Sequence, residues 1–226
     1  MKKTKSEGKC IFCSDTFSKA AMTRHLQSCK QRKAVIEALP VKGRTKSARI
    51  FHILVEGRYL PEYWMHIEAP ANATLEDLDS FLRETWLECC GHLSAFRIGG
   101  VSYSADTDNE FGDEDIERVL GDVLSPGLKF YHEYDFGTTT ELTLRVVSER
   151  EGVFKGKSVQ LMARNNPPLI MCESCGKAAA SIICAECSWS GGGWLCDRCA
   201  KGHECGEDMF LPVVNSPRAG ECGYVG

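Results

Sequence analysis

The sequence lacks the long apolar runs of a membrane protein. No stretch of its 226 residues approaches the roughly 18 consecutive apolar residues needed to span a bilayer. The N-terminus, MKKTKSEGKC, begins with positive charge, but the apolar segment of a secretory signal does not follow it. We therefore expect a cytoplasmic protein without a membrane partner, in a compartment that keeps thiols reduced.

Recognisable catalytic motifs are also scarce. The sequence contains no nucleophile motif and no glycine-rich phosphate loop. The candidate catalytic side chains in the middle of the chain are His92, His132, Glu133 and Asp135, but strand alternation in KFYHEYDFG puts His132 on the face opposite to Asp135. We expect structural roles for these residues, with an enzyme of unknown chemistry as an alternative.

Cysteine, in contrast, is abundant. The chain contains 13 cysteines, an odd number that suits a disulfide framework poorly. In a reducing compartment this count favours metal binding over disulfides. Most of the cysteines lie near the two ends of the sequence. Cys89 and Cys90 lie apart from them, without a second cysteine pair nearby, and we expect them to be buried structural thiols.

A first cluster, CIFCSDTFSKAAMTRHLQSC, has the ligand spacing of a small zinc site. Cys10 and Cys13 form a Cys-x-x-Cys knuckle, and His25 and Cys29 lie one helical turn apart, so that all four can face one ion. The apolar residues between the pairs supply the small core of such a finger. The cluster resembles a ββα zinc finger with Cys in place of the second His, although its central interval is one residue shorter than usual.

The region around this finger is basic. Residues 1–50 hold 13 Lys and Arg against three acidic residues, a net charge of about +10, while the remainder is about −14. Of the base-reading positions of a ββα finger, only Arg24 can hold a base with two hydrogen bonds. We therefore expect weak, salt-sensitive contact with nucleic-acid phosphates, or contact with another protein; a solvated tail is the alternative. The side chains expected to make the contact are Lys19, Arg24, Lys30, Arg32 and Lys33.

The C-terminal block, CESCGKAAASIICAECSWSGGGWLCDRCAKGHEC, contains three Cys-x-x-Cys knuckles. Three knuckles with a trailing His are more specific for zinc than for a redox pair. In a cross-brace, the first and third knuckles share one ion, and the second knuckle shares another with His203 and either Cys205 or Cys222. A single ion with extra thiols is the alternative. The predicted ligands are Cys172, Cys175, Cys184, Cys187, Cys196, Cys199, His203, Cys205 and Cys222.

Residues 49–150 have no paired-cysteine motif and predict an ordinary apolar core. Helices with apolar faces are predicted at 74–88 and 113–124. Strands are predicted at 49–57, 62–69, 94–104, 127–137 and 141–149. This order predicts an α+β fold, with a β-grasp-like mixed sheet and one main helix, flanked by small zinc-binding modules.

The middle segment also resembles a known family. Gly91-His92-Leu93, the strand Phe96–Tyr103 and the run YDFG at 134–137 resemble the Ri-plasmid open-reading-frame-three-like proteins, some of which are described as passengers of insertion elements. The resemblance covers about residues 49–150 and implies a compact α+β domain without an established activity. The family usually continues after YDFG with Asp, Trp and His, whereas this chain continues with TTTEL. The resemblance therefore implies no role that depends on that Trp or His in this chain.

Together these patterns predict a zinc protein in five parts: a finger at 1–33, a basic linker at 34–48, an α+β domain at 49–150, a linker at 151–168 and a zinc-binding module at 169–226. The ligands suffice for about three zinc ions, one N-terminal and two C-terminal. We expect a non-enzymatic binding or adaptor protein associated with nucleic acid or mobile elements. The alternative is an adaptor that contacts only other proteins.

Overall fold

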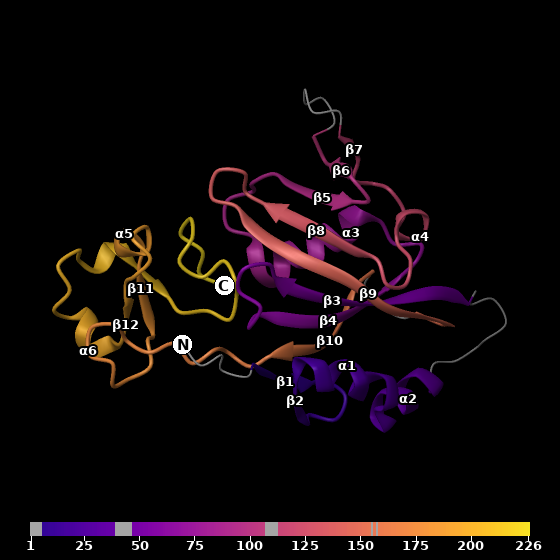
Figure 1. The fold of residues 1–226 in the computed structure, drawn as a ribbon, viewed down its shortest axis with the longest axis horizontal. Helices are drawn as coiled ribbons and strands as arrows, with labels where there is room; N and C mark the ends of the chain where they lie inside the picture. The colour runs from indigo at the N-terminus through magenta and orange to yellow at the C-terminus, as the bar shows by residue number, and fades with distance from the viewer. Residues whose placement is uncertain (1–5, 39–46, 107–112, 155, 157) are drawn as a thin grey trace. The chain divides into compact units, whose positions relative to one another are not determined.

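The structure is a computed structural model that describes residues 6–38, 47–106, 113–154, 156 and 158–226 (Figure 1). The chain divides into two compact units. Unit 1 comprises Met1–Leu82 and Leu93–Asn166, and unit 2 comprises Arg83–His92 and Pro167–Gly226. Every helix of the described residues is too short or too polar to cross a bilayer.

Unit 1 is built on a ten-stranded sheet with the order β2-β1-β10-β4-β3-β9-β8-β5-β6-β7, in which β6 and β7 run parallel (Figure 1). Its strands are β1 (Glu7–Cys10), β2 (Thr16–Ser18), β3 (Ala48–Gly57), β4 (Trp64–Pro70), β5 (Ser94–Ile98), β6 (Val101–Ser104), β7 (Glu114–Asp115), β8 (Lys129–Tyr134), β9 (Thr140–Gly152) and β10 (Gln160–Asn165). Its helices are α1 (Lys19–Ser28), α2 (Lys30–Glu37), α3 (Leu75–Leu82) and α4 (Leu120–Val123). The structure thus shows the predicted α+β class as a large mixed sheet with helices, and not a specific β-grasp.

The central strands are buried on both faces because helices cover each face. All residues of β4 are buried. On one face, Asp79 of α3 contacts His132 of β8 at 2.6 Å. The strand register places Leu54 of β3 on the opposite face, where Met22 and Leu26 of α1 pack against it. The sheet therefore provides one core for α3 and a second for the N-terminal finger.

The finger is joined to the sheet by strand pairing. β1 pairs with β10, and β10 forms from residues that the sequence assigns to the linker 151–168. At Gly8, an added Cβ would lie 2.3 Å from the carbonyl oxygen of Arg164 and 2.5 Å from the ring of Trp64. Only glycine fits such an approach, so the pairing of finger and sheet depends on this residue.

Local sequence signals set several element ends. Thr74 and Asp77 form the expected capping box of α3: the Asp77 amide donates to Thr74 Oγ1 at 3.1 Å, and the Thr74 amide donates to Asp77 Oδ2 at 3.0 Å. Gly99 and Gly100 have φ values of 59° and 90° and connect β5 to β6 in a hairpin, where the sequence predicts one strand at 94–104. Residues 113–124 form β7 and the short α4 in place of one helix.

A buried ionic network ties α2 to the sheet. Arg32 of α2 pairs with Glu68 of β4, and Arg150 of β9 donates to the same carboxylate at 2.9 and 3.0 Å. Burial alone would raise the pKa of Glu68, but hydrogen bonds and positive charge from Arg150 and Arg32 outweigh burial and lower that pKa. Arg32 also donates to the carbonyl oxygen of Leu26 at 2.6 Å. The ionised Glu68 therefore fixes α2 against the strand next to β10.

Unit 2 contains a small three-stranded sheet with the order β12-β11-β13. Its elements are the π-helical η1 (Arg83–Leu87), β11 (Ile182–Cys184), α5 (Ala185–Ser188), β12 (Trp194–Leu195), α6 (Asp197–Ala200), the 3-10 helix η2 (Glu207–Met209) and β13 (Phe210–Pro212). Its apolar cluster joins Leu195, Ala200, Ile182 and Phe210 to cysteine side chains. Sulfur atoms therefore make up much of its small core.

We predict that Thr74→Ala destabilises unit 1 by about 1 kcal/mol, because it removes the side-chain acceptor of the capping box. Ser80 is exposed on the same helix, so Ser80→Ala is a matched control and should change the free energy of unfolding by less than about 0.5 kcal/mol. Urea unfolding followed by circular dichroism measures both. Equal losses in the two variants would contradict the capping role of Thr74.

Candidate metal centres

Cysteine and histidine side chains gather into four groups, and in each group four ligand atoms lie within 4.8 Å of one another. The groups contain all 13 cysteines of the chain, and none of these forms a disulfide. The first group lies in unit 1 and the other three lie in unit 2. The groups are Cys10, Cys13, His25 and Cys29 (first); Cys172, Cys175, Cys196 and Cys199 (second); Cys184, Cys187, His203 and Cys205 (third); and Cys89, Cys90, His92 and Cys222 (fourth).

The spacing of the ligand atoms fits a tetrahedral zinc ion. Zn–S bonds of about 2.3 Å and Zn–N bonds of about 2.0 Å place two sulfur ligands about 3.8 Å apart, and sulfur and nitrogen about 3.5 Å apart. The Sγ atoms of Cys175 and Cys196 are 3.9 Å apart, and those of Cys187 and Cys205 are 3.7 Å apart. A disulfide would need about 2.05 Å. These separations therefore match ligands of one ion.

The first group is formed by a hairpin knuckle and a helix end. Cys10 ends β1, and Cys13 follows in a turn that the Ser14 amide closes by donating to the Cys10 carbonyl at 2.9 Å. His25 lies in the last turn of α1 with its Nε2 3.3 Å from Cys13 Sγ, and Cys29 follows the helix. Burial raises the pKa of the Cys13 thiol to about 12. The predicted finger ligands thus meet at one point.

The finger core is shared with the sheet. Cys10 and Cys29 are buried in a cluster with Met22 and Leu26 of the finger and with Leu54, Trp64, Met162 and Ala163 of the sheet. The Phe17 ring stacks on the His25 imidazole at a centroid distance of 4.2 Å. The ring and the sheet side chains orient the ligands, so the finger is a part of unit 1.

Of the basic side chains predicted to contact phosphates, some pair with carboxylates of unit 1 and the others are exposed. Lys19 pairs with Glu56 of β3 and donates to the Pro61 carbonyl at 3.1 Å, and Arg32 is buried against Glu68. Arg24, Lys30 and Lys33 are exposed. The charges of Lys19 and Arg32 are thus used inside unit 1, and the exposed candidates are the other three.

The second group joins the first and third knuckles, the arrangement expected of a cross-brace. The Gly176 amide donates to the Cys172 carbonyl at 2.8 Å, and the Ala200 amide donates to the Cys196 carbonyl at 3.0 Å, so each knuckle is a closed turn. A hydrogen bond from the Cys196 amide lowers the pKa of Cys172 to about 6. The thiolate form that binds metal is therefore favoured at this ligand.

The third group joins the second knuckle to His203 and Cys205. His203 Nε2 lies 3.4 Å from Cys187 Sγ. Gly193 has a φ of 90° and passes so close to the Cys184 knuckle that an added Cβ would lie 2.9 Å from the Cys184 carbonyl oxygen. Of the two candidates for the last ligand, the structure places Cys205 in this group and Cys222 elsewhere.

The fourth group was not predicted from the sequence. Cys222 lies beside Cys89, Cys90 and His92, with His92 Nε2 3.2 Å from Cys222 Sγ. The expectation that Cys89 and Cys90 are buried structural thiols is wrong, because Cys90 is exposed and Cys89 is half-buried. One signal in the sequence could have revealed this group. The C-terminal block has one candidate ligand more than two four-ligand sites need, and Cys89-Cys90-x-His92 has one fewer than a four-ligand site needs.

The other histidines lie in the interior of unit 1. His52 Nε2 and His66 Nδ1 are 2.8 Å apart, and burial lowers the pKa of each ring to about 3. His132 is fully buried against Asp79. Asp135 Oδ1 accepts a hydrogen bond from the Gly137 amide at 3.0 Å, as a turn cap does. The contacts of His132 and Asp135 agree with the structural roles expected from the sequence, which made no prediction for His52 and His66.

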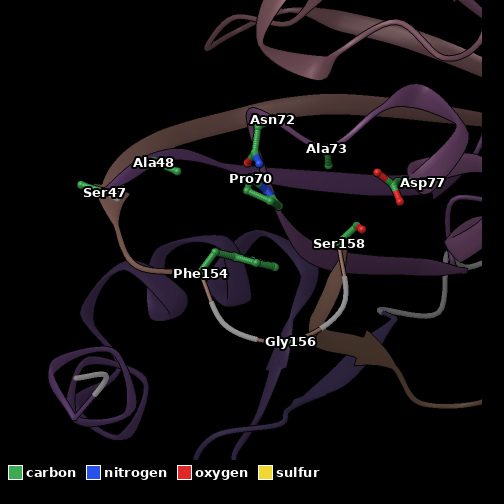
Figure 2. Close-up of a pocket in the computed structure, with 9 residues that line it drawn as sticks. All are labelled: Ser47, Ala48, Pro70, Asn72, Ala73, Asp77, Phe154, Gly156 and Ser158. Atoms are coloured by element: carbon green, nitrogen blue, oxygen red, sulfur yellow. The ribbon is translucent and has the colours of Figure 1, made fainter. Parts of the chain in front are cut away.

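A cavity of about 510 Å³ lies in unit 1 between the start of β3, the end of β4 and the residues Phe154, Gly156 and Ser158 (Figure 2). Most of its described lining is small, and Phe154 supplies the one aromatic ring among the residues drawn. Its carboxylate, Asp77, already accepts hydrogen bonds from Thr74. The described lining therefore offers space but no cluster of reactive groups.

Comparison with known proteins gives little beyond this geometry. No protein-family model matches the chain. No curated protein matches it either. Among solved structures, the chain is similar to a crystal structure of a protein of unknown function from Methanosarcina mazei Go1, with 18% sequence identity and a TM-score of 0.46 over 52% of this chain and 69% of that chain. This similarity carries no argument about function, and the resemblance to the Ri-plasmid family stays a prediction.

We predict that zinc affinity rises with pH. In the third group, hydrogen bonds to Cys184 and Cys205 raise the pKa of Cys187 to about 12, so its thiol is protonated at neutral pH and must lose that proton to bind metal. Each displaced proton changes the affinity about tenfold per pH unit, so zinc is held more weakly as the pH falls from 8 to 6. Competition with a fluorescent zinc chelator measures this slope. A pH-independent affinity would contradict thiolate ligation.

Proposed function

We propose that the chain is a zinc-binding protein whose zinc ions are structural, and that it acts as a non-enzymatic binding or adaptor protein. The main support is the gathering of all 13 cysteines into groups that each offer four protein ligands. Four protein ligands leave no position open for a reacting water or substrate, which is the arrangement of structural zinc sites.

The chemistry of the ligands supports zinc over other metals. The first, third and fourth groups each combine three thiols with one imidazole. Tetrahedral sites of sulfur and nitrogen suit Zn²⁺, and oxygen ligands, which Mg²⁺ and Ca²⁺ prefer, are not part of the groups. The second group, with four thiols, also fits iron, so metal analysis decides its occupant.

The surroundings of the non-ligand histidines support a non-enzymatic role. His52, His66 and His132 are buried, and each contacts a partner in the interior of unit 1. A general base must reach its substrate, and buried rings do not offer that access.

Nucleic-acid binding is the second candidate function. Its support is that Arg24, Lys30 and Lys33 are exposed in the N-terminal region, where basic residues outnumber acidic ones by ten. Because this region can attract phosphates but has one good base-reading side chain, we propose weak binding that is nearly independent of sequence. An adaptor that contacts only proteins is the alternative.

We predict that a strong chelator unfolds unit 2 but not the sheet of unit 1. Unit 2 has a small core made largely of cysteine, whereas β3, β4 and β9 have apolar cores of their own. Hydrogen exchange with mass spectrometry should show lost protection in 167–226 and retained protection in these three strands. Co²⁺ in place of zinc should give tetrahedral ligand-field bands. Persistent protection of 167–226 after complete metal removal would oppose structural zinc there.

For nucleic acid, we predict that the triple variant Arg24→Ala, Lys30→Ala and Lys33→Ala weakens binding to any DNA sequence and reduces the slope of log affinity against log salt by about three. Substitution is preferred to truncation, because β1 belongs to the sheet. The matched control removes three exposed cations of unit 2, Lys177, Arg198 and Lys201, and should leave the slope unchanged. If both triple variants behave alike, or if the wild type does not bind at low salt, the protein-only adaptor is preferred.

A further inference from the structure

We propose that the fourth group binds a zinc ion that fastens the C-terminal tail, residues 213–226, to Arg83–His92, and that this ion exchanges more readily than the other three. The ligands are Cys89, Cys90 and His92 from one segment and Cys222 from the tail. The inference rests on the proposed structural zinc and adds a separate site with a separate role.

The backbone around these ligands is arranged to bring them together. Gly91 has a φ of 72°, which lets the chain turn between Cys90 and His92 so that both side chains face one point. Cys222 itself has a φ of 45°, which is unfavourable for a residue with a side chain. Such a conformation persists when its surroundings hold it, and a metal bond to Sγ is one way to hold it.

Charge balance also fits a metal at this place. Three thiolates and one Zn²⁺ leave one negative charge, which a neighbouring cation can balance. Arg218 is fully buried, and its Nη2 lies 3.4 Å from Cys89 Sγ. The Arg218 amide donates to Ser216 Oγ at 2.9 Å, and that hydroxyl donates to the Trp86 carbonyl at 2.6 Å. Tail and segment are therefore joined both by hydrogen bonds and by the ligands.

Exposure sets this site apart from the others. The first, second and third groups each contain at least one buried cysteine, whereas the fourth contains none, and its Cys90 and Cys222 are exposed. A competing ligand can approach an exposed zinc and take a fifth position before a protein ligand leaves. The fourth ion is therefore the one that a chelator removes first, and with it the tail loses its fastening.

The test counts zinc and probes the tail in the same samples. Native mass spectrometry should find four zinc ions in the full wild-type chain and three in Cys222→Ser. Cys222→His, which keeps a ligand, should restore the fourth. Val225 is exposed in the same tail and is not a ligand, so Val225→Ser is the matched control and should keep four. Graded chelation should take one ion from the wild type before the other three.

Trypsin reports on the tail independently of the count. Arg218 is buried when the tail is fastened, so cleavage there, which releases residues 219–226, should be slow in the wild type and in Val225→Ser. Cleavage should be at least tenfold faster in Cys222→Ser. It should be faster to the same degree in wild-type protein from which graded chelation has removed one zinc ion. Cys13→Ser, which removes a ligand of the first group in unit 1, should lower the count by one without exposing Arg218.

The outcomes separate this site from the wider proposal. A wild type with three ions, unchanged by Cys222→Ser, would overturn the fourth site and leave the structural zinc of the other groups intact. Equal cleavage at Arg218 in the wild type and in Cys222→Ser would overturn the fastening of the tail. A chain without zinc would overturn both proposals.

Discussion

The small core around Leu195 in unit 2 contains as many cysteines as other side chains, and this composition shapes the C-terminal module. Its cluster contains Leu195, Ala200, Ile182 and Phe210, and cysteines fill most of the remaining contacts. In a core of this size, burial does not offset the conformational entropy lost on folding. Structural zinc contributes about 10–16 kcal/mol in small modules, and at the proposed sites it would be enough to reverse that balance. The closed knuckle turns and the close approach of Gly193 then follow from the need to aim thiols at shared points.

Unit 1 obtains its stable core from a large sheet. Its central strands are buried on both faces, and several polar side chains inside contact one another: Arg32 and Arg150 surround Glu68, and His52 contacts His66. The finger uses this core instead of building one of its own. At the proposed zinc site, metal ligation would order a short hairpin and helix, and the sheet supplies most of the apolar surface that they bury.

The sequence predicts what is local and misses what is distant. Cys-x-x-Cys knuckles, the helix-turn spacing of His25 and Cys29 and the capping box at Thr74 each involve residues within one turn, so spacing alone identifies them. Cys222 and His92 are 130 positions apart, and their meeting depends on the path of the whole chain. β10 was missed for a similar reason: QLMARN lacks strict alternation, and it becomes a strand because β4 and β1 lie on either side of it.

The placement of the finger shows why ligand spacing does not predict what a finger binds. A free ββα module leaves all its cations to the solvent, whereas here the strand pairing of β1 with β10 brings Lys19 to Glu56 and Arg32 to Glu68. Two of the cations expected at phosphates thus neutralise carboxylates inside the fold. If Arg32 left Glu68 to bind a phosphate, the buried carboxylate would lose part of its counter-charge, and this loss costs free energy. Contact with a polyanion is therefore left to the cations that stay exposed when the finger pairs with the sheet. This pairing, and not the spacing of the cysteine and histidine side chains, limits the number of cations that the finger can offer.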